Sequence, residues 1–259
     1  MRKRLFTVAL WLGLIGCQPS PDAVLSGKAQ RVTDQAIAAH GGGALEQTIF
    51  SFDFRKKHYV VQLNQGKFRY ESSGRDSTGA LVHDVLTNQN FTRSVDDQPL
   101  KLSSEDQRRH GNSLNSVVYF VLLPYPLNDP AVTKEYVGET TLAGEPYHKI
   151  RVTFSPEGGG DDFDDEYIYW IHRERHTMDY LAYSFEVNGG GTRFREAYNS
   201  RTIKGIRFDD YINYESTVDD FALKDYDQLF EAGKVKELSR IETENVEVEG
   251  AEIQRATYF

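Results

Sequence analysis

The sequence predicts an α+β fold in which an antiparallel sheet of about ten strands packs against two or three helices. Three observations lead to this class. Two segments carry apolar residues at helical spacing, and a long stretch after each of them alternates apolar and polar residues with a period of two. Strands do not alternate with crossover helices, so a parallel barrel or a dinucleotide-binding fold is not expected.

The N-terminal segment predicts export and a lipid anchor. Three basic residues open the chain, and the apolar run Leu5 to Ile15 that follows is too short to span a bilayer as a helix. The residues LIGC, which end at Cys17, resemble a bacterial lipobox, whose cysteine becomes the lipidated first residue of the mature protein. Cys17 is the only cysteine of the chain. We therefore expect residues 1–16 to be a signal peptide and residues 17–27 to form the lipidated cysteine and a tether. A free buried cysteine behind an ordinary cleaved signal is the alternative.

The mature chain is strongly acidic. Removal of residues 1–16 leaves 243 residues (259 − 16), with 27 Lys and Arg (30 − 3) against 39 Asp and Glu, a formal net charge of −12. Such a charge argues against nucleic-acid partners and against non-specific binding to anionic lipid. Because a second cysteine is lacking, residues 28–259 must be held together by their own hydrophobic core, and we expect them to form a single domain.

The first half of this domain predicts one helix followed by a meander. Residues 28–40 carry apolar side chains at helical spacing, and the three glycines that follow predict the end of the helix. Phe50, Phe52 and Phe54 then alternate with polar residues, which is the pattern of a strand with one buried face. We count about five short antiparallel strands over residues 48–95.

The second half repeats this plan. Residues 103–123 return to helical spacing, and the segment PYPLNDP ends the helix. A short helix over residues 225–237 and a last strand, RIETENVEVEG, are expected near the end of the chain. The strands of the second meander are expected at residues 133–141, 147–154, 166–172, 178–187, 192–199 and 206–214.

Alternate turns of a meander lie at opposite ends of a sheet, so the loops 155–165 and 188–191 should share one end with the segment 126–131. This rim gathers carboxylate and amide oxygens from Asn128, Asp129, Asp161, Asp162, Asp164, Asp165 and Asn188. Oxygen ligands suit calcium. The candidate ligands of a calcium ion are Asp161, Asp162, Asp164 and Asp165, and no other cofactor is expected. The run DDFDDE lacks the ligand spacing of an EF-hand, so a solvated hairpin loop is the alternative.

The faces of two strands predict what lies inside the sheet. His148 shares a strand face with Ile150 and therefore points toward the core or a cavity. Arg193 and Arg195 share one face of a later strand, and two interpretations stay open for them. They form a row of arginines that faces water, or one of them lines a polar pocket together with His148 and Tyr183.

The mature chain offers no catalytic motif with a mechanism. It contains no G-x-S-x-G, no H-E-x-x-H and no cysteine nucleophile, and His172 and His176 straddle a strand end and a turn, where they do not predict a zinc site. We therefore expect a non-catalytic protein. An envelope hydrolase that uses His148 with a rim carboxylate such as Asp161 is one alternative, and a scaffold lipoprotein without a pocket is another.

Three stretches carry a family resemblance. AIAAHGGGALEQTIFSFDF, YFVLLPYPLNDP and MDYLAYSFEVNGGGTRFREAYN, which span much of residues 36–199, resemble a family of uncharacterised envelope lipoproteins of Bacteroidota type. At the level of the fold, the mature chain resembles the lipoprotein carrier and receptor proteins of the Lol system. That resemblance implies a strongly curved sheet, or half-open barrel, with helices on its concave side and a cavity that holds acyl chains.

The function expected from this resemblance is a membrane-anchored periplasmic lipoprotein that binds a lipid or an acyl chain. Gln18 follows Cys17 where an aspartate would signal retention in the inner membrane, so the resemblance implies the outer membrane. An error of one residue in strand parity would exchange the two faces of a strand. The residues expected around the cavity are Phe52, Phe54, Tyr119, Leu122, His148, Ile150, Tyr183 and Phe185.

Overall fold

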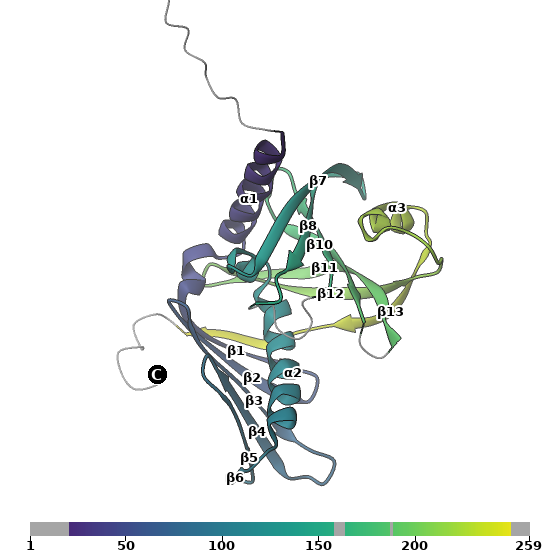
Figure 1. Cartoon of the computed structure of the whole chain (residues 1–259). Coiled ribbons are helices and arrows are strands. Elements are labelled where there is room, and N and C mark those ends of the chain that lie inside the picture. The colour runs from purple at the N-terminus through teal and green to yellow at the C-terminus, as the bar shows by residue number, and fades with distance from the viewer. Residues whose placement is uncertain (1–20, 158–163, 187–188, 250–259) are drawn as a thin grey trace, which may run out of the picture.

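The computed structural model describes residues 21–157, 164–186 and 189–249. This described part contains two seven-stranded antiparallel sheets and three α-helices, an α+β architecture (Figure 1). The strands predicted to form one curved sheet thus divide into two sheets. The two sheets do not close into a barrel within the described residues, so the predicted half-open barrel is not confirmed. The predicted signal peptide and the lipidation site Cys17 lie outside the described residues.

The first sheet contains the predicted N-terminal meander and one strand from the end of the chain, in the order β14-β1-β2-β3-β4-β5-β6. Phe50 and Phe52 are fully buried on one face of β1, as the alternation of the sequence predicts. The strands are β1 (Gln47–Phe54), β2 (Lys57–Asn64), β3 (Lys67–Arg75), β4 (Leu81–Thr87), β5 (Phe91–Val95), β6 (Gln98–Leu100) and β14 (Glu244–Glu249).

The second sheet contains the other meander, in the order β13-β12-β11-β10-β9-β8-β7. Val132 pairs with Phe154, and Phe185 pairs with Gly191, so the residues that flank the predicted rim loops lie at one end of this sheet. The strands are β7 (Val132–Leu142), β8 (Glu145–Phe154), β9 (Tyr167–His172), β10 (Met178–Phe185), β11 (Gly191–Ile203), β12 (Ile206–Ser216) and β13 (Val235–Ile241).

Both faces of the second sheet are buried. All six residues of β9 are buried, and successive side chains of a strand point to opposite faces. Tyr169 belongs to a core on the inner face, which α1 and the end of α2 cover, whereas Trp170 belongs to a core on the outer face, which α3 covers. The prediction that the helices share one concave side therefore does not hold for α3.

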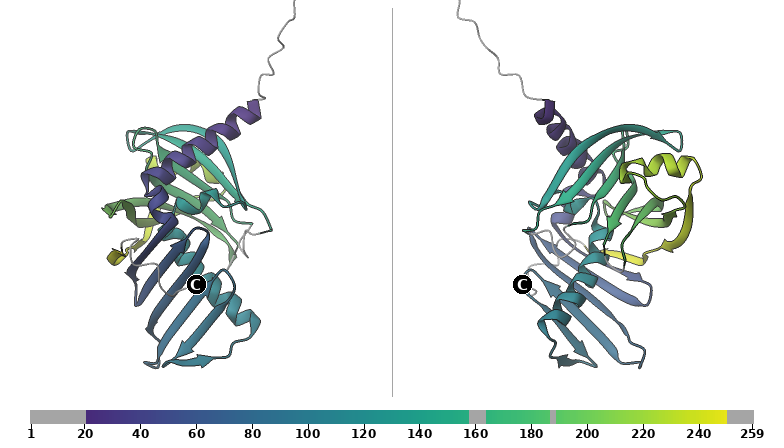
Figure 2. Two further views of the ribbon diagram at one scale, coloured as in Figure 1. Left: turned by 90° about the vertical axis from the view of Figure 1, so that its left-hand side faces the viewer. Right: turned by 45° about the vertical axis from the view of Figure 1, so that its right-hand side comes forward.

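The helices are α1 (Pro21–Ala39), α2 (Ser104–Leu122) and α3 (Tyr226–Glu231). The Ser103 hydroxyl accepts a hydrogen bond from the backbone N–H of Asp106 and so caps α2. α1 begins at Pro21, inside the segment predicted as a tether, and Figure 2 shows it lying across the second sheet. Within the described residues, no helix is both long enough and apolar enough to cross a membrane.

The two sheets are joined where the chain passes from β13 to β14. β13 pairs with β12 of the second sheet, and β14 pairs with β1 of the first, so the single last strand predicted from the sequence is two strands. The buried Asp210 carboxylate accepts a hydrogen bond of 2.9 Å from the backbone N–H of Thr243 and fixes this crossing. A second link is the hydrogen bond of 3.1 Å that the backbone N–H of Arg207 donates to the carbonyl of His40.

Candidate ligand-binding site

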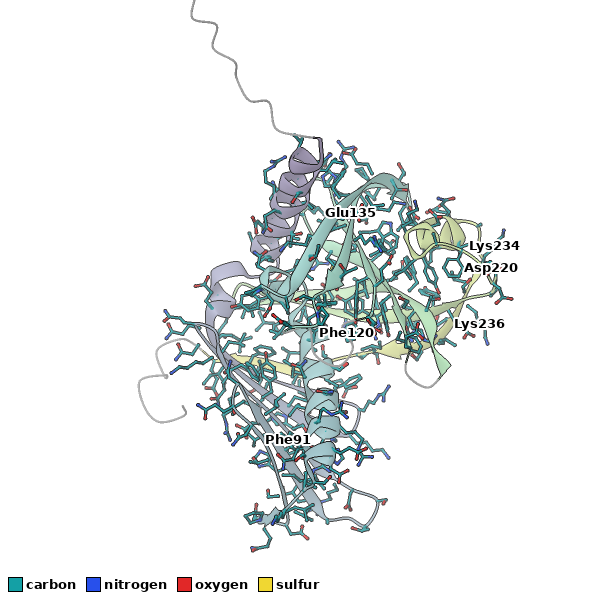
Figure 3. The ribbon with its side chains drawn as sticks, viewed as in Figure 1. Phe91, Phe120, Glu135, Asp220, Lys234 and Lys236 are labelled. Atoms are coloured by element: carbon teal, nitrogen blue, oxygen red, sulfur yellow. The ribbon has the colours of Figure 1, made fainter. Side chains whose placement is uncertain are left out.

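Helix α2 runs along the first sheet and ends beneath the second (Figure 3). Leu114 and Val118 bury one side of the helix in the core of the first sheet, while Tyr119 and Phe120 pack against the inner core of the second. In Figure 3, Phe91 marks the first sheet beside the helix and Phe120 marks the point where the helix meets the second sheet. The C-terminal end of the helix therefore lies where the cores of the two sheets meet.

A cavity lies on each side of α2. Cavity A has a volume of about 370 Å³ and cavity B about 330 Å³. Both volumes fall at the lower end of the range of small-molecule sites. Cavity A is lined by Phe54, Arg55, Ser116, Val117, Phe120, Val121, Asp165, Tyr167, Tyr183, Phe185, Arg195, Asp209, Tyr211, Ile241 and Thr243. Cavity B is lined by Phe68, Tyr70, Asn115, Tyr119, Leu122, Pro126, Asp129, Ala131, Val132 and Phe154.

The wall of cavity A contains a buried arginine. Arg195 is 8% exposed, and its guanidinium lies 3.9 Å from the ring centroid of Phe120. Its Nη2 donates a hydrogen bond of 2.9 Å to the Tyr183 hydroxyl. Its Nε is buried and has no hydrogen-bond partner among the described residues. The aromatic rings thus hold the guanidinium in place and leave part of its donor capacity unused.

A second polar group at cavity A belongs to a buried network. Asp209 accepts a hydrogen bond of 2.9 Å from Nε of Arg207, and its Oδ2 lies 3.9 Å from Nδ1 of His40. Burial raises the pKa of Asp209, although the Arg207 charge acts against this shift. Burial also lowers the pKa of His40 to about 3, so this imidazole is neutral at physiological pH. The only formal charges in this pair of contacts are therefore those of Asp209 and Arg207.

Two tyrosines of cavity A, Tyr167 and Tyr211, are neutral groups. Burial raises the pKa of Tyr167 and of Tyr211, and nearby carboxylates add to the shift. Because the ordinary pKa of tyrosine is already about 10, both phenols keep their protons at any physiological pH. They offer a ligand flat apolar surface and a neutral hydroxyl.

The structure places five of the eight predicted cavity residues at the two cavities and the other three elsewhere. Phe54, Tyr183 and Phe185 line cavity A, and Tyr119 and Leu122 line cavity B. Phe52 and Ile150 are fully buried in the two cores that flank α2, and His148 lines neither cavity.

His148 lies near the far end of its strand. Its Nδ1 is 2.9 Å from the Tyr136 hydroxyl and 3.7 Å from a carboxylate oxygen of Glu139. His148 lies six positions before Phe154 at the rim, which is about 20 Å at the rise of a strand. The predicted partner Asp161 lies outside the described residues, and the strand geometry favours no hydrolase built from His148 and the rim.

The two interpretations of the arginine strand are resolved in favour of a pocket, with a different composition. Arg195 joins Tyr183 in cavity A, but His148 is not part of the pocket. Phe120, Asp209 and Tyr211 line cavity A but were not predicted to do so. Phe120 could have been found from helical spacing, because it lies one turn from Val117 on α2; the β12 residues carry no local signal.

The calcium site stays a prediction. Asp164 and Asp165 lie within the described residues, whereas Asp161, Asp162 and Asn188 lie outside them. Within residues 21–157, 164–186 and 189–249, no group of three or more His, Cys, Asp or Glu is arranged to hold a metal ion. At the same rim, the Asn128 side chain donates a hydrogen bond to Asp34, and the Asp129 carboxylate accepts one from the backbone of Ala131.

Structural comparison found solved structures that are similar to this chain. A LolA superfamily protein from Nitrosomonas europaea is similar with a TM-score of 0.51 at 10% identity, over 86% of this chain and 94% of that chain. A putative outer membrane lipoprotein-sorting protein domain from Vibrio parahaemolyticus gives a TM-score of 0.46 at 6% identity, over 86% and 93% of the two chains. The first of these shows a LolA-like fold, which confirms the fold-level resemblance to the Lol proteins.

A comparison with curated protein sequences found no match. The family comparison matched residues 28–243, which include every strand from β1 to β13 and the second and third helices. This match bears out the resemblance to an uncharacterised family that the sequence motifs indicated. The chain belongs to the family of unknown function DUF6503.

Proposed function

We propose that this protein is an envelope lipoprotein that binds an apolar or amphipathic ligand, such as a lipid or an acyl chain, without catalysing a reaction. The observation that carries this proposal is cavity A. Nine of its fifteen lining residues are aromatic or aliphatic, and the other six are polar or charged. A mostly apolar pocket with a small number of placed polar groups is the usual form of a small-molecule site.

The proposed location in the cell envelope depends on the sequence. The lipobox at Cys17 supports a lipid anchor, and Gln18 supports sorting to the outer membrane, with the folded domain facing the periplasm. The LolA-like fold is compatible with lipid binding. Because this chain and the LolA superfamily protein are alike only in their fold, the proposed class of ligand depends on the lining of cavity A. The partners of this proposal are the membrane, through the anchor, and a lipid or acyl ligand.

Native mass spectrometry of the chain from Gln18 to Phe259 tests the proposal, because this form contains every described residue. We expect the gently purified protein to carry lipid of defined mass, to lose it on delipidation and to take it up again. Val117→Trp should fill cavity A and reduce lipid uptake. Ser113→Trp is the matched control, because Ser113 is exposed on the same helix and lines neither cavity.

Two results would count against the proposal, and a third would show that the variants disturb the helix itself. A protein that carries no lipid and takes up none has no such binding role. Equal lipid uptake by the wild type and Val117→Trp would place the ligand outside cavity A. Equal loss of uptake in Val117→Trp and Ser113→Trp would show a general effect on α2, and the melting temperatures of both variants would identify it.

A further inference from the structure

We propose that cavity A selects ligands with a single negative charge, and that Arg195 binds the charged head group of an alkyl or acyl chain. This inference rests on the proposed function and names the class of ligand: a long-chain carboxylate or another amphiphile with one anionic head. Arg195 carries the argument because it is a buried charge whose own contacts within the described residues do not explain it.

The first step is the state of the guanidinium. An arginine presents five N–H donors, and moving a charged group out of water is costly unless it is paired. The Tyr183 hydroxyl accepts from Nη2 of Arg195, the Nε of Arg195 has no partner, and no ion pair joins Arg195 to a carboxylate of the described residues. A buried polar group without a partner calls for an explanation, and an acceptor atom of a ligand in the adjoining cavity provides one for this N–H.

The second step is the geometry. The guanidinium lies over the Phe120 ring at 3.9 Å and beside the Tyr183 ring at 5.1 Å, both measured to the ring centroid. Stacking fixes the plane of the group and leaves its edge for hydrogen bonds. A carboxylate meets such an edge with two parallel N–H···O bonds. Arg195 also lines cavity A, so an anion in the cavity can reach that edge.

The third step is the charge of the ligand. The lining contains two arginines, Arg55 and Arg195, and two aspartates, Asp165 and Asp209. Asp209 is already paired with Arg207, which lies behind the lining. The remaining charges of the lining are Arg55 and Arg195 against Asp165, a surplus of one positive charge. A single negative charge on the ligand balances this surplus, whereas the second charge of a dianionic phosphate would not be balanced. Like charges at close range cost binding free energy, so a monoanionic head fits this lining best.

The apolar residues of the lining fit the alkyl chain of the proposed ligand. Val117, Val121 and Ile241 offer apolar surface beside the aromatic rings, and an alkyl chain gains binding free energy from each buried methylene. Cavity A thus joins one fixed cation to an apolar wall. This is the arrangement that an amphiphile with one charged end requires.

The test compares two ligands that differ only in the head group. Delipidated protein from Gln18 to Phe259 is titrated calorimetrically with dodecanoate and with dodecan-1-ol at pH 7.5. We expect dodecanoate to bind about 10-fold to 100-fold more tightly, because a hydrogen bond to a charged group contributes that much. Arg195→Met should remove this preference and leave the affinity for dodecan-1-ol within about 3-fold of the wild type.

Two further variants make the result specific. Arg193→Met is the matched control, since Arg193 lies on the same strand face, donates to the backbone carbonyl of Thr192 and does not line cavity A. It should keep the preference. Tyr183→Phe removes the acceptor that orients Arg195 and should reduce the preference only in part. If Arg195→Met does not fold, the two-ligand comparison in the wild type and Tyr183→Phe still decides.

The outcomes separate this inference from the proposed function. Equal affinity of the wild type for both ligands, or an unchanged preference in Arg195→Met, would overturn the anion site while lipid binding stands. Binding of neither ligand, together with no lipid in the native mass spectra, would overturn both.

Discussion

Protonation of His40 should make this protein sensitive to acid. His40 is 2% exposed, and its Nε2 accepts a hydrogen bond of 3.0 Å from the backbone N–H of Met178. The proton of the neutral ring is therefore on Nδ1, and adding a second proton at Nε2 would break this contact. Burial lowers the pKa of His40 from 6.5 to about 3 in the folded protein, and the Arg207 charge adds to the shift.

The direction and size of the effect of pH on the free energy of unfolding follow from the difference in the His40 pKa between the folded and unfolded protein. The unfolded chain binds this proton more readily than the folded one, so the free energy of unfolding decreases as the pH falls below 6.5 and levels off near pH 3. Each pH unit in this window corresponds to about 1.4 kcal/mol, so lowering the pH from 7.5 to 5.0 should cost about 2 kcal/mol through His40 alone. Asp209 acts in the opposite direction, because its raised pKa stabilises the folded state at low pH and this stabilisation is lost as the pH rises.

The variant His40→Gln isolates the histidine. The amide oxygen of Gln can accept the Met178 N–H without titrating, and all other ionisable groups stay the same. Urea unfolding at pH 7.5 and 5.0 should show that the wild type loses about 2 kcal/mol more than the variant over this interval. An NMR titration of the His40 ring should find no protonation above pH 5. Equal losses in the two proteins, or protonation near pH 6.5, would refute the reasoning.

Two other predictions concern stability. Lys149 of β8 and Asp227 of α3 form a buried ion pair at 3.0 Å, so Lys149→Met should lower the free energy of unfolding by about 3 to 5 kcal/mol. Adding Asp227→Leu should restore much of this loss. Chemical denaturation of both variants checks the prediction, and an unchanged free energy of unfolding in Lys149→Met would contradict it. Gly41 has φ 128°, and a Cβ there would lie 3.2 Å from the Cα of Ile206, so Gly41→Ala should cost about 1 to 3 kcal/mol. In contrast, Gly43→Ala meets nothing within 4 Å and should leave the melting temperature almost unchanged, so a similar loss in both variants would rule out the close contact as the cause.

Local patterns predicted most elements of this fold. The helix expected over residues 103–123 is α2 at Ser104–Leu122, and the alternation of Phe50 and Phe52 gave the correct buried face of β1. The division into two sheets could not be predicted in the same way. It depends on the pairing of β14 with β1, which joins residues about 200 positions apart, and no periodicity in either strand records its partner.

The side of the second sheet on which α3 lies could not be predicted either, for a different reason. One of its inner strands, β9, has the sequence YIYWIH and is buried on both faces, because α1 and α2 cover one face and α3 covers the other. A strand of this kind carries no alternation, so the sequence could not show that α3 lies opposite the other helices. The buried ion pair of Lys149 with Asp227 belongs to that outer face, where an alternating strand pattern would place a lysine in water.

At the candidate site, the face on which a strand residue lies could be predicted, but its position along the strand relative to the site could not. Parity correctly put His148 on the same face as Ile150, but it says nothing of position along the strand, and His148 lies about 20 Å from the rim. Arg195 shows the converse. The sequence did not show whether Arg195 points toward the interior or toward water, because both faces of β11 carry residues able to pack or to be solvated. The position of α2 places Arg195 in the interior, where Phe120 lies against the guanidinium. A binding site between two sheets and a helix is therefore defined by where the helix lies, and the residues that test it best are those that touch α2.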